Sequence, residues 1–156
     1  MTKFKQPTLE LTLQLPNGWL AIEGKELFAK YMNLSPEQVE GTEFVLVEFV
    51  NNEPTRKIRV TKGYGEYSTL WEYFDALSFD VQEMLRDNAI KLKSHTALAN
   101  SGAPLYHITI RFRSGATTNF SYAYHNKQFL CFAMPIMSDN IGVDNTVMES
   151  IVASIA

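Results

Sequence analysis

Residues 105–134 read LYHITIRFRSGATTNFSYAYHNKQFLCFAM, and the alternation of apolar and polar side chains in this stretch decides the fold. Successive side chains of a β-strand point to opposite faces of a sheet, so the run from Tyr106 to Arg113 predicts a half-buried strand. A second alternating run follows Ser114-Gly115, and a third follows Asn126-Lys127. We therefore expect a three-stranded antiparallel meander.

The loop at Ser114-Gly115 decides which side chains of the meander face the core, because a slip of one residue exchanges the two faces of a strand. A two-residue loop would place Phe120 opposite Thr109, whereas a three-residue loop places Phe120 opposite Ile110. We favour the three-residue loop, since loops of this length with a glycine are common and this one gathers the apolar side chains on one face. The predicted core face comprises Tyr106, Ile108, Ile110, Phe112, Phe120, Tyr122, Tyr124, Phe129, Cys131 and Ala133.

The opposite face of the meander is polar on its first two strands but apolar on its third, where Leu130, Phe132 and Met134 need a cover. The C-terminal segment has few charges, and a helix from Asn145 to Ala153 or beyond is apolar enough to dock there. We favour docking of this helix on its own sheet. The alternative is a homodimer through Val147, Met148, Ile151 and Val152.

The rest of the chain alternates between predicted strands and helices. Strands are expected over residues 9–15, 44–50 and 57–61. Helices are expected after Asn17 and Ser35, from the capping-box pair Thr69 and Glu72 to Leu77, and from Ser78 to about Ala99. The order β-α-β-β-α-α-β-β-β-α predicts a single α+β domain over residues 1–156, with about six mainly antiparallel strands and helices packed against them.

Composition narrows the class of protein. The chain has 156 residues, a net charge of −3 and 46% hydrophobic residues, which is typical of a globular protein and unlike a general nucleic-acid binder. No apolar stretch approaches the ~18 residues of a membrane-spanning helix, and the N-terminus lacks a signal-peptide pattern. We expect a cytoplasmic protein without a membrane association.

The chain has few of the histidine and cysteine residues that form zinc sites. His95, His107 and His125 are the only histidines, and none of the HExxH, CxxC or HxH spacings of zinc sites occurs. The three histidines fall on a predicted helix, a predicted strand and a predicted turn. We therefore expect neither a metal nor a cofactor, and convergence of the three histidines is the alternative.

One short motif suggests an enzyme. His107-Ile108-Thr109 resembles the His-x-Thr strand motif of the two-histidine phosphodiesterases, in which each of two such motifs contributes a histidine and a hydroxyl to a cyclic-phosphate site. The resemblance implies that His107 and Thr109 are catalytic residues. It covers three residues, and neither His95-Thr96-Ala97 nor His125-Asn126-Lys127 supplies the second motif.

Residues 27–39 have apolar and small residues spaced as in a helix-turn-helix motif. The segment in the position of the recognition helix, residues 35–40, carries two acidic residues and no basic one. Such a surface repels phosphate, so nucleic acid is not an expected partner.

Basic side chains gather at two places, and these are the residues that we expect to bind a partner protein with an acidic surface. Lysine and arginine on a strand edge also discourage pairing with other sheets, which is the alternative role for the first group. The expected partner-binding residues are Arg56, Lys57, Arg59 and Lys62 on one predicted hairpin, and His107, Arg111 and Arg113 on the meander.

The sequence holds no complete catalytic set, so the main prediction is a non-catalytic protein-binding domain, such as a small inhibitor, immunity or anti-defence protein or an assembly factor. The first alternative is a small phosphodiesterase-like enzyme that uses His107 and Thr109. The second is a structural or chaperone-like homodimer.

Overall fold

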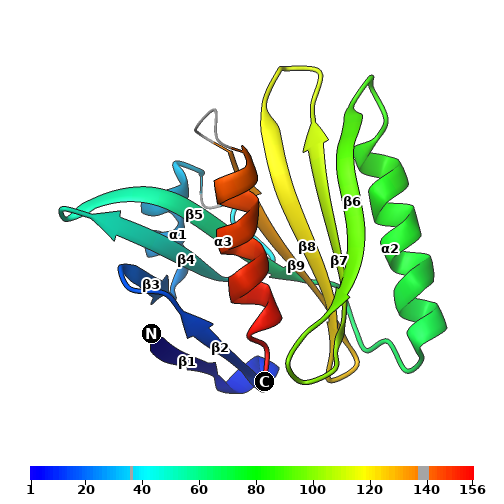
Figure 1. Cartoon of the computed structure of the whole chain (residues 1–156), viewed down its shortest axis with the longest axis horizontal. Helices are drawn as coiled ribbons and strands as arrows, with labels where there is room; N and C mark the ends of the chain where they lie inside the picture. The colour runs from blue at the N-terminus through cyan, green and yellow to red at the C-terminus, as the bar shows by residue number, and fades with distance from the viewer. Residues whose placement is uncertain (36, 137–140) are drawn as a thin grey trace.

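A seven-stranded antiparallel sheet forms the centre of the computed structural model, which describes residues 1–35, 37–136 and 141–156 (Figure 1). In chain order the strands are β3 (Trp19–Ile22), β4 (Thr42–Val50), β5 (Glu53–Lys62), β6 (Ile90–Leu98), β7 (Pro104–Arg111), β8 (Thr117–His125) and β9 (Gln128–Pro135). Their order across the sheet is β3-β4-β5-β9-β8-β7-β6. A separate two-stranded sheet consists of β1 (Thr2–Gln6) and β2 (Leu11–Leu15), which are joined by the 3-10 turn Pro7–Leu9. The expected mainly antiparallel α+β fold is confirmed.

The described residues form three α-helices beside the sheet: α1 (Lys25–Met32), α2 (Leu70–Met84) and α3 (Ile141–Ala153). In Figure 1, α3 crosses the front face of the sheet, α2 lies beside β6, and α1 lies behind β4 and β5. Thr69 caps α2 by accepting a hydrogen bond from the Glu72 backbone N–H, and Glu72 in turn accepts one from the Ser68 N–H, so the predicted capping interaction is present. None of the helices in the described part of the chain is long and apolar enough to cross a membrane.

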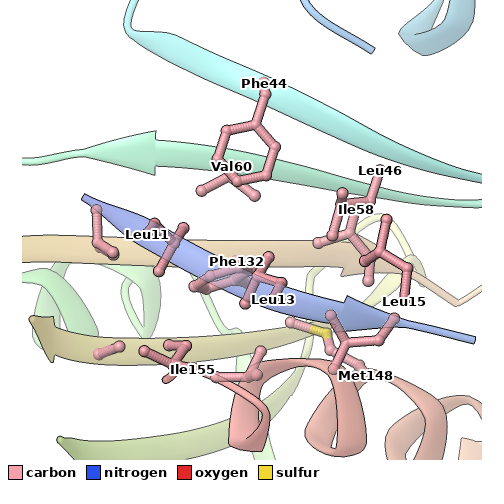
Figure 2. Close-up of a cluster of buried hydrophobic side chains, with 14 of the residues drawn as sticks. Leu11, Leu13, Leu15, Phe44, Leu46, Ile58, Val60, Phe132, Met148 and Ile155 are labelled. Atoms are coloured by element: carbon pink, nitrogen blue, oxygen red, sulfur yellow. The ribbon is translucent and has the colours of Figure 1, made fainter. Parts of the chain in front are cut away.

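Most of the larger core lies on the front face, between the sheet, α3 and the β1–β2 hairpin, and a smaller part lies between β4 and α1. Leucines of β2 lie over apolar side chains of β4 and β5, and α3 closes the other side (Figure 2). Figure 2 labels Leu11, Leu13, Leu15, Phe44, Leu46, Ile58, Val60, Phe132, Met148 and Ile155, all of them buried. Leu130, Phe132 and Met134 belong to this core, so the apolar third strand of the meander is covered within the chain, by a core to which both α3 and β2 contribute.

This packing bears directly on the homodimer alternative. Met148, Ile151 and Val152 are buried against the chain's own sheet, and Val147 is partly buried beside them. A dimer that used these side chains would first have to lift α3 from the sheet and expose the larger core.

The smaller core lies on the back face, where α2 covers β7, β8 and β9. Tyr73 of α2 packs against Tyr124 and Phe129 with ring centroids 5.2 Å and 5.6 Å apart, and the Tyr122 hydroxyl donates to Asp80 at 2.7 Å. Every residue of the predicted core face of the meander except Ala133 belongs to this cluster. The predicted division of the meander into two faces is therefore confirmed.

The register of the first hairpin differs from the prediction by two residues. Phe120 pairs with Ile108 and not with Ile110, because the three-residue loop runs from Arg113 to Gly115 and is closed by the hydrogen bond from Phe112 N to Ala116 O at 2.8 Å. A shift of two residues keeps every side chain on its face. The predicted two-residue turn at Asn126-Lys127 is present, with φ values of 49° and 60°.

The prediction of a helix directly after Asn17 was wrong. Trp19–Ile22 instead pairs with β4 as strand β3, and α1 begins only at Lys25. Gly18 has a φ of 90° and its carbonyl accepts the Phe49 N–H, so a turn at this point directs the chain into the sheet.

The prediction of a helix from Ser78 to Ala99 was also wrong. Ser78 lies inside α2, and Asp87 and Asn88 form a turn with positive φ that leads into β6. Strand β6 forms one edge of the sheet and most of its side chains are exposed. It therefore lacks the regular alternation of buried and exposed residues that would identify it as a strand. Strand β1 was not predicted. The short helix that was predicted after Ser35 includes Pro36, which lies outside the described residues.

Candidate functional site

The front face of the sheet changes from apolar to polar where side chains of β7 and β8 face α3. Four buried side chains of β7 and β8 meet two polar side chains of α3 in this region, which we call the polar cluster. Its members are His107, Thr109, Asn119, Ser121, Asn145 and Glu149, and all of these except Glu149 are buried.

Hydrogen bonds hold most side chains of the polar cluster in place. Thr109 Oγ1 donates to Asn119 Oδ1 at 2.6 Å, and Asn145 Nδ2 donates to Thr109 Oγ1 at 3.4 Å. Asn119 Nδ2 and Asn145 Oδ1 are buried without a partner among the described residues. A cavity of about 10 Å³ lies beside them, and this is room for about one water molecule that could satisfy both atoms.

At the edge of the polar cluster, two histidines and a glutamate converge. His95 of β6 and His107 of β7 are cross-strand partners with ring centroids 4.9 Å apart. His95 Nε2 lies 2.9 Å from Glu149 Oε1 of α3. One nitrogen or oxygen atom from each of the three side chains lies within 4.8 Å of the others.

His107 is oriented and kept neutral by its surroundings. Its Nδ1 atom is hydrogen-bonded to Ser121 Oγ at 2.7 Å. Burial lowers the pKa of His107 to about 4, with smaller contributions from His95 and the Lys93 ammonium. A neutral imidazole has a nitrogen lone pair available near pH 7.

The sequence motif of the two-histidine phosphodiesterases falls inside this cluster. His107 and Thr109 line the small cavity of about 10 Å³, which is far too small for a phosphate ester. His125 does not join them, because it lies at the end of β8, where its Nε2 contacts the Glu10 carbonyl oxygen at 2.9 Å.

A second feature of the molecule is an apolar groove on the back of the sheet, between α2 and the lower ends of β6 and β7. It has a volume of about 460 Å³ and is open to solvent. Phe74 and Leu77 line it on the helix side, and Leu98 and Tyr106 line it on the sheet side. We call this the α2 groove.

Large apolar side chains remain exposed around the α2 groove. Trp71 is 77% exposed, Leu98 is 70% exposed and Phe74 is 42% exposed. Trp71 and Phe74 are in edge-to-face contact, with ring centroids 6.3 Å apart. A concentration of exposed aromatic and aliphatic side chains beside a groove is typical of an interaction surface.

The basic residues that were expected to bind an acidic partner do not form one surface. Arg56 is bound to Glu48 and Asp144 on the front face, and Lys57 and Arg59 point to the opposite side of β5. Arg59 is also engaged with Thr42 and with the Gln38 carbonyl. Two strands separate these residues from β7.

The remaining expected partner-binding residues lie apart from that group. Lys62 lines a pocket together with Glu40 and Glu43. His107 is 6% exposed and therefore inaccessible to a partner. Arg111 and Arg113 are exposed at the end of the first meander hairpin, as expected.

Sequence reasoning missed both the His95–Glu149 contact and the α2 groove. Both depend on β6, which was interpreted as a helix. The alternation of Ile90-Lys91-Leu92-Lys93 at the start of this segment was a partial signal of a strand, but the polar run from Ser94 to Thr96 interrupts it.

No family model matches this chain, and no curated protein matches its sequence. A crystal structure of a protein from Bacteroides thetaiotaomicron VPI-5482 matches with 16% identity and a TM-score of 0.47, covering 99% of this chain and 47% of that one. The fold is more similar to the solution structure of cyanobacterial PsbP (CyanoP) from Synechocystis sp. PCC 6803. That match has a TM-score of 0.61 and 12% identity, and it covers 99% of this chain and 91% of that one. The chain therefore has a PsbP-like α+β fold.

Proposed function

We propose that this chain is a non-catalytic protein-binding domain that holds an apolar segment of a partner protein in the α2 groove. The observation that carries the proposal is the groove itself, with a volume of about 460 Å³ and with exposed Phe74 and Leu98 at its rim. Leaving such side chains in water has no structural benefit, whereas burying them against a partner is favourable by roughly 25 cal/mol per Å² of apolar surface.

The charge around the α2 groove indicates the chemistry of the partner. Residues 69–82 and 96–106, which include every residue lining the groove, contain Glu72, Asp75 and Asp80 and no lysine or arginine. A segment with lysine or arginine beside its apolar residues complements this surface. The proposed partner is therefore basic, in contrast to the acidic partner expected from the sequence.

Tryptophan fluorescence provides a direct test, because Trp71 is exposed beside the groove and Trp19 is buried in the core. A short amphipathic peptide of leucine and lysine should bind and shift the Trp71 emission to the blue. The matching peptide of leucine and glutamate should bind more weakly, because its charge has the same sign as that of the groove.

Variants then locate the binding surface. Phe74→Asp and Leu98→Asp should each weaken binding of the leucine-lysine peptide by roughly 30-fold or more, as expected for a central apolar contact. Leu20→Asp is the matched control, because Leu20 is 56% exposed on β3 at the other edge of the sheet. Equal affinities for the Phe74→Asp and Leu20→Asp variants would overturn the proposal. If only a small apolar dye binds, and Phe74→Asp abolishes its binding, the groove is a small-molecule site instead.

A further inference from the structure

We propose that His95, His107 and Glu149 form a binding site for a divalent transition-metal ion, with Zn²⁺ as the best match. The three side chains come from β6, β7 and α3, and one ligand atom of each lies within 4.8 Å of the others. Among the described residues this is the one group of three or more metal-binding side chains that converge in this way.

The geometry requires only small movements. Two ligand atoms bound to tetrahedral zinc at 2.0–2.1 Å lie roughly 3.3 Å apart. His95 Nε2 and Glu149 Oε1 are already 2.9 Å apart, and the rings of His95 and His107, on neighbouring strands, have centroids 4.9 Å apart. His95 is exposed and can change its rotamer without disturbing the core, because its side chain is 44% accessible.

The surroundings prepare His107 for this role. Its Nδ1 atom is held by Ser121 Oγ at 2.7 Å, so the ring is fixed and Nε2 remains for a ligand bond. Metal-binding histidines commonly have such a partner on the second nitrogen, which orients the ring. Two nitrogen ligands and one carboxylate also match the His₂Glu sets of known zinc sites, in which water completes the coordination.

One neighbouring charge opposes the metal. Lys93 lines the same cavity, and its ammonium disfavours a second positive charge at His107. We therefore expect that removing the positive charge of Lys93 will strengthen Zn²⁺ binding. A histidine that bound metal adventitiously elsewhere on the surface would show no such dependence on Lys93.

The test uses the untagged full chain, freed of metal with a chelator and titrated with Zn²⁺ by calorimetry. We expect one ion per chain with a micromolar dissociation constant, and no binding of Mg²⁺, which prefers oxygen ligands. At a hundredfold excess over the dissociation constant, Zn²⁺ should raise the melting temperature by roughly 5–10 °C. Cobalt should give the visible absorption bands of a four-coordinate site.

Variants complete the test. His95→Ala and Glu149→Gln should each weaken Zn²⁺ binding by roughly tenfold or more, whereas Lys93→Gln should strengthen it. Glu66→Gln is the control, since Glu66 is exposed in a loop outside the cluster. The proposal is overturned if the wild type has no submillimolar affinity, or if His95→Ala binds Zn²⁺ as tightly as the wild type. Circular dichroism of each variant distinguishes a lost ligand from a lost fold.

Discussion

Arg56 connects three elements through a single guanidinium group. Its Nε and Nη2 atoms donate to the two carboxylate oxygens of Glu48 at 2.9 Å and 2.8 Å, and its Nη1 atom donates to Asp144 of α3 at 3.2 Å. The side chains of Glu48 and Asp144 are 14% and 8% exposed, so these charges are largely removed from water. Arg56 therefore fastens the first turn of α3 to the β4–β5 hairpin.

Replacing Arg56 would leave two carboxylates close together with no cation between them. Arg56→Gln should lower the free energy of unfolding by about 2 kcal/mol at neutral pH, which is less than for a fully buried pair because Arg56 is partly exposed. Urea unfolding measures this change. Lys57→Gln, on the next residue and the opposite face of β5, should leave the free energy of unfolding unchanged within about 0.5 kcal/mol.

The same ion pair makes stability depend on pH. The hydrogen bond from Arg56 holds the pKa of Glu48 below its usual range, so the folded protein binds this proton less readily than the unfolded chain does. The stabilisation is present above the unfolded pKa and is lost as the pH falls through the folded pKa. The free energy of unfolding should thus decline as the pH falls below the ordinary glutamate pKa of 4.5, and the decline should be shallower in Arg56→Gln. Parallel curves for the two proteins would show that Glu48 does not contribute.

At the scale of elements, the β8–β9 hairpin shows how turn chemistry fixes a register. Asn126 and Lys127 both have positive φ, as a type I′ turn requires. Asparagine tolerates this backbone conformation, but lysine adopts it at a cost because its Cβ atom is crowded there. The Lys127 carbonyl also accepts the Tyr67 N–H at 2.8 Å, which depends on the backbone alone.

Lys127→Gly should therefore stabilise the protein by about 0.5–1 kcal/mol, because glycine reaches this conformation without strain. Thermal unfolding should show a rise in the melting temperature of roughly 1–4 °C. Lys127→Ala keeps the Cβ atom and serves as the control, with a melting temperature no higher than that of the wild type. A stabilised Lys127→Ala variant would contradict the explanation by strain.

The elements that sequence reasoning predicted well are those whose side chains divide cleanly between core and solvent. The meander has one face in each core, so its alternation identifies both strands and faces. Thr69 and Glu72 identify the start of α2 because a capping box is a local interaction. The sequence did not identify strand β6, because this edge strand has no clearly buried face. It did not identify β1 either, because the lysines of β1 alternate with a single phenylalanine.

At the scale of the whole molecule, the C-terminal residues join parts of the chain that are far apart in sequence. Backbone N–H groups of Asn100 and Ser101 donate to the carbonyls of Ala153 and Ile155, and Ala156 N donates to Thr12 O. The Ile155 side chain is completely buried in the larger core. These contacts tie the end of α3 both to the β6–β7 loop and to β2.

Ile155→Ala should consequently lower the free energy of unfolding by roughly 2–4 kcal/mol, through lost apolar burial and the cavity that remains. Val50→Ala is the control, since Val50 is 49% exposed at the end of β4 and should change stability by less than about 0.5 kcal/mol. Chemical denaturation of both variants measures the difference. A small effect of Ile155→Ala would mean that the last residues are not part of the cooperative unit.

The candidate sites could not be predicted from the sequence because they are assembled by these distant contacts. Glu149 meets His95 only because α3 packs on the front of the sheet, and no local pattern around residue 149 indicates that position. The α2 groove likewise needs the position of α2 relative to β6 and β7. In contrast, the burial of Leu130, Phe132 and Met134 followed from their alternation, although β2 contributes to this core as well as α3.

The order of strands has a consequence for how the chain folds. Strands β3 to β5 and strands β6 to β9 are two groups in which every neighbour in space is also the next strand in sequence. In the described part of the chain, only the β5–β9 pairing joins the groups, through four residue pairs between residues 59–62 and 130–133. Closing a loop of about 70 residues for so few pairs is entropically expensive. We therefore expect pairing of β5 with β9 to form later in folding than the pairings within each group.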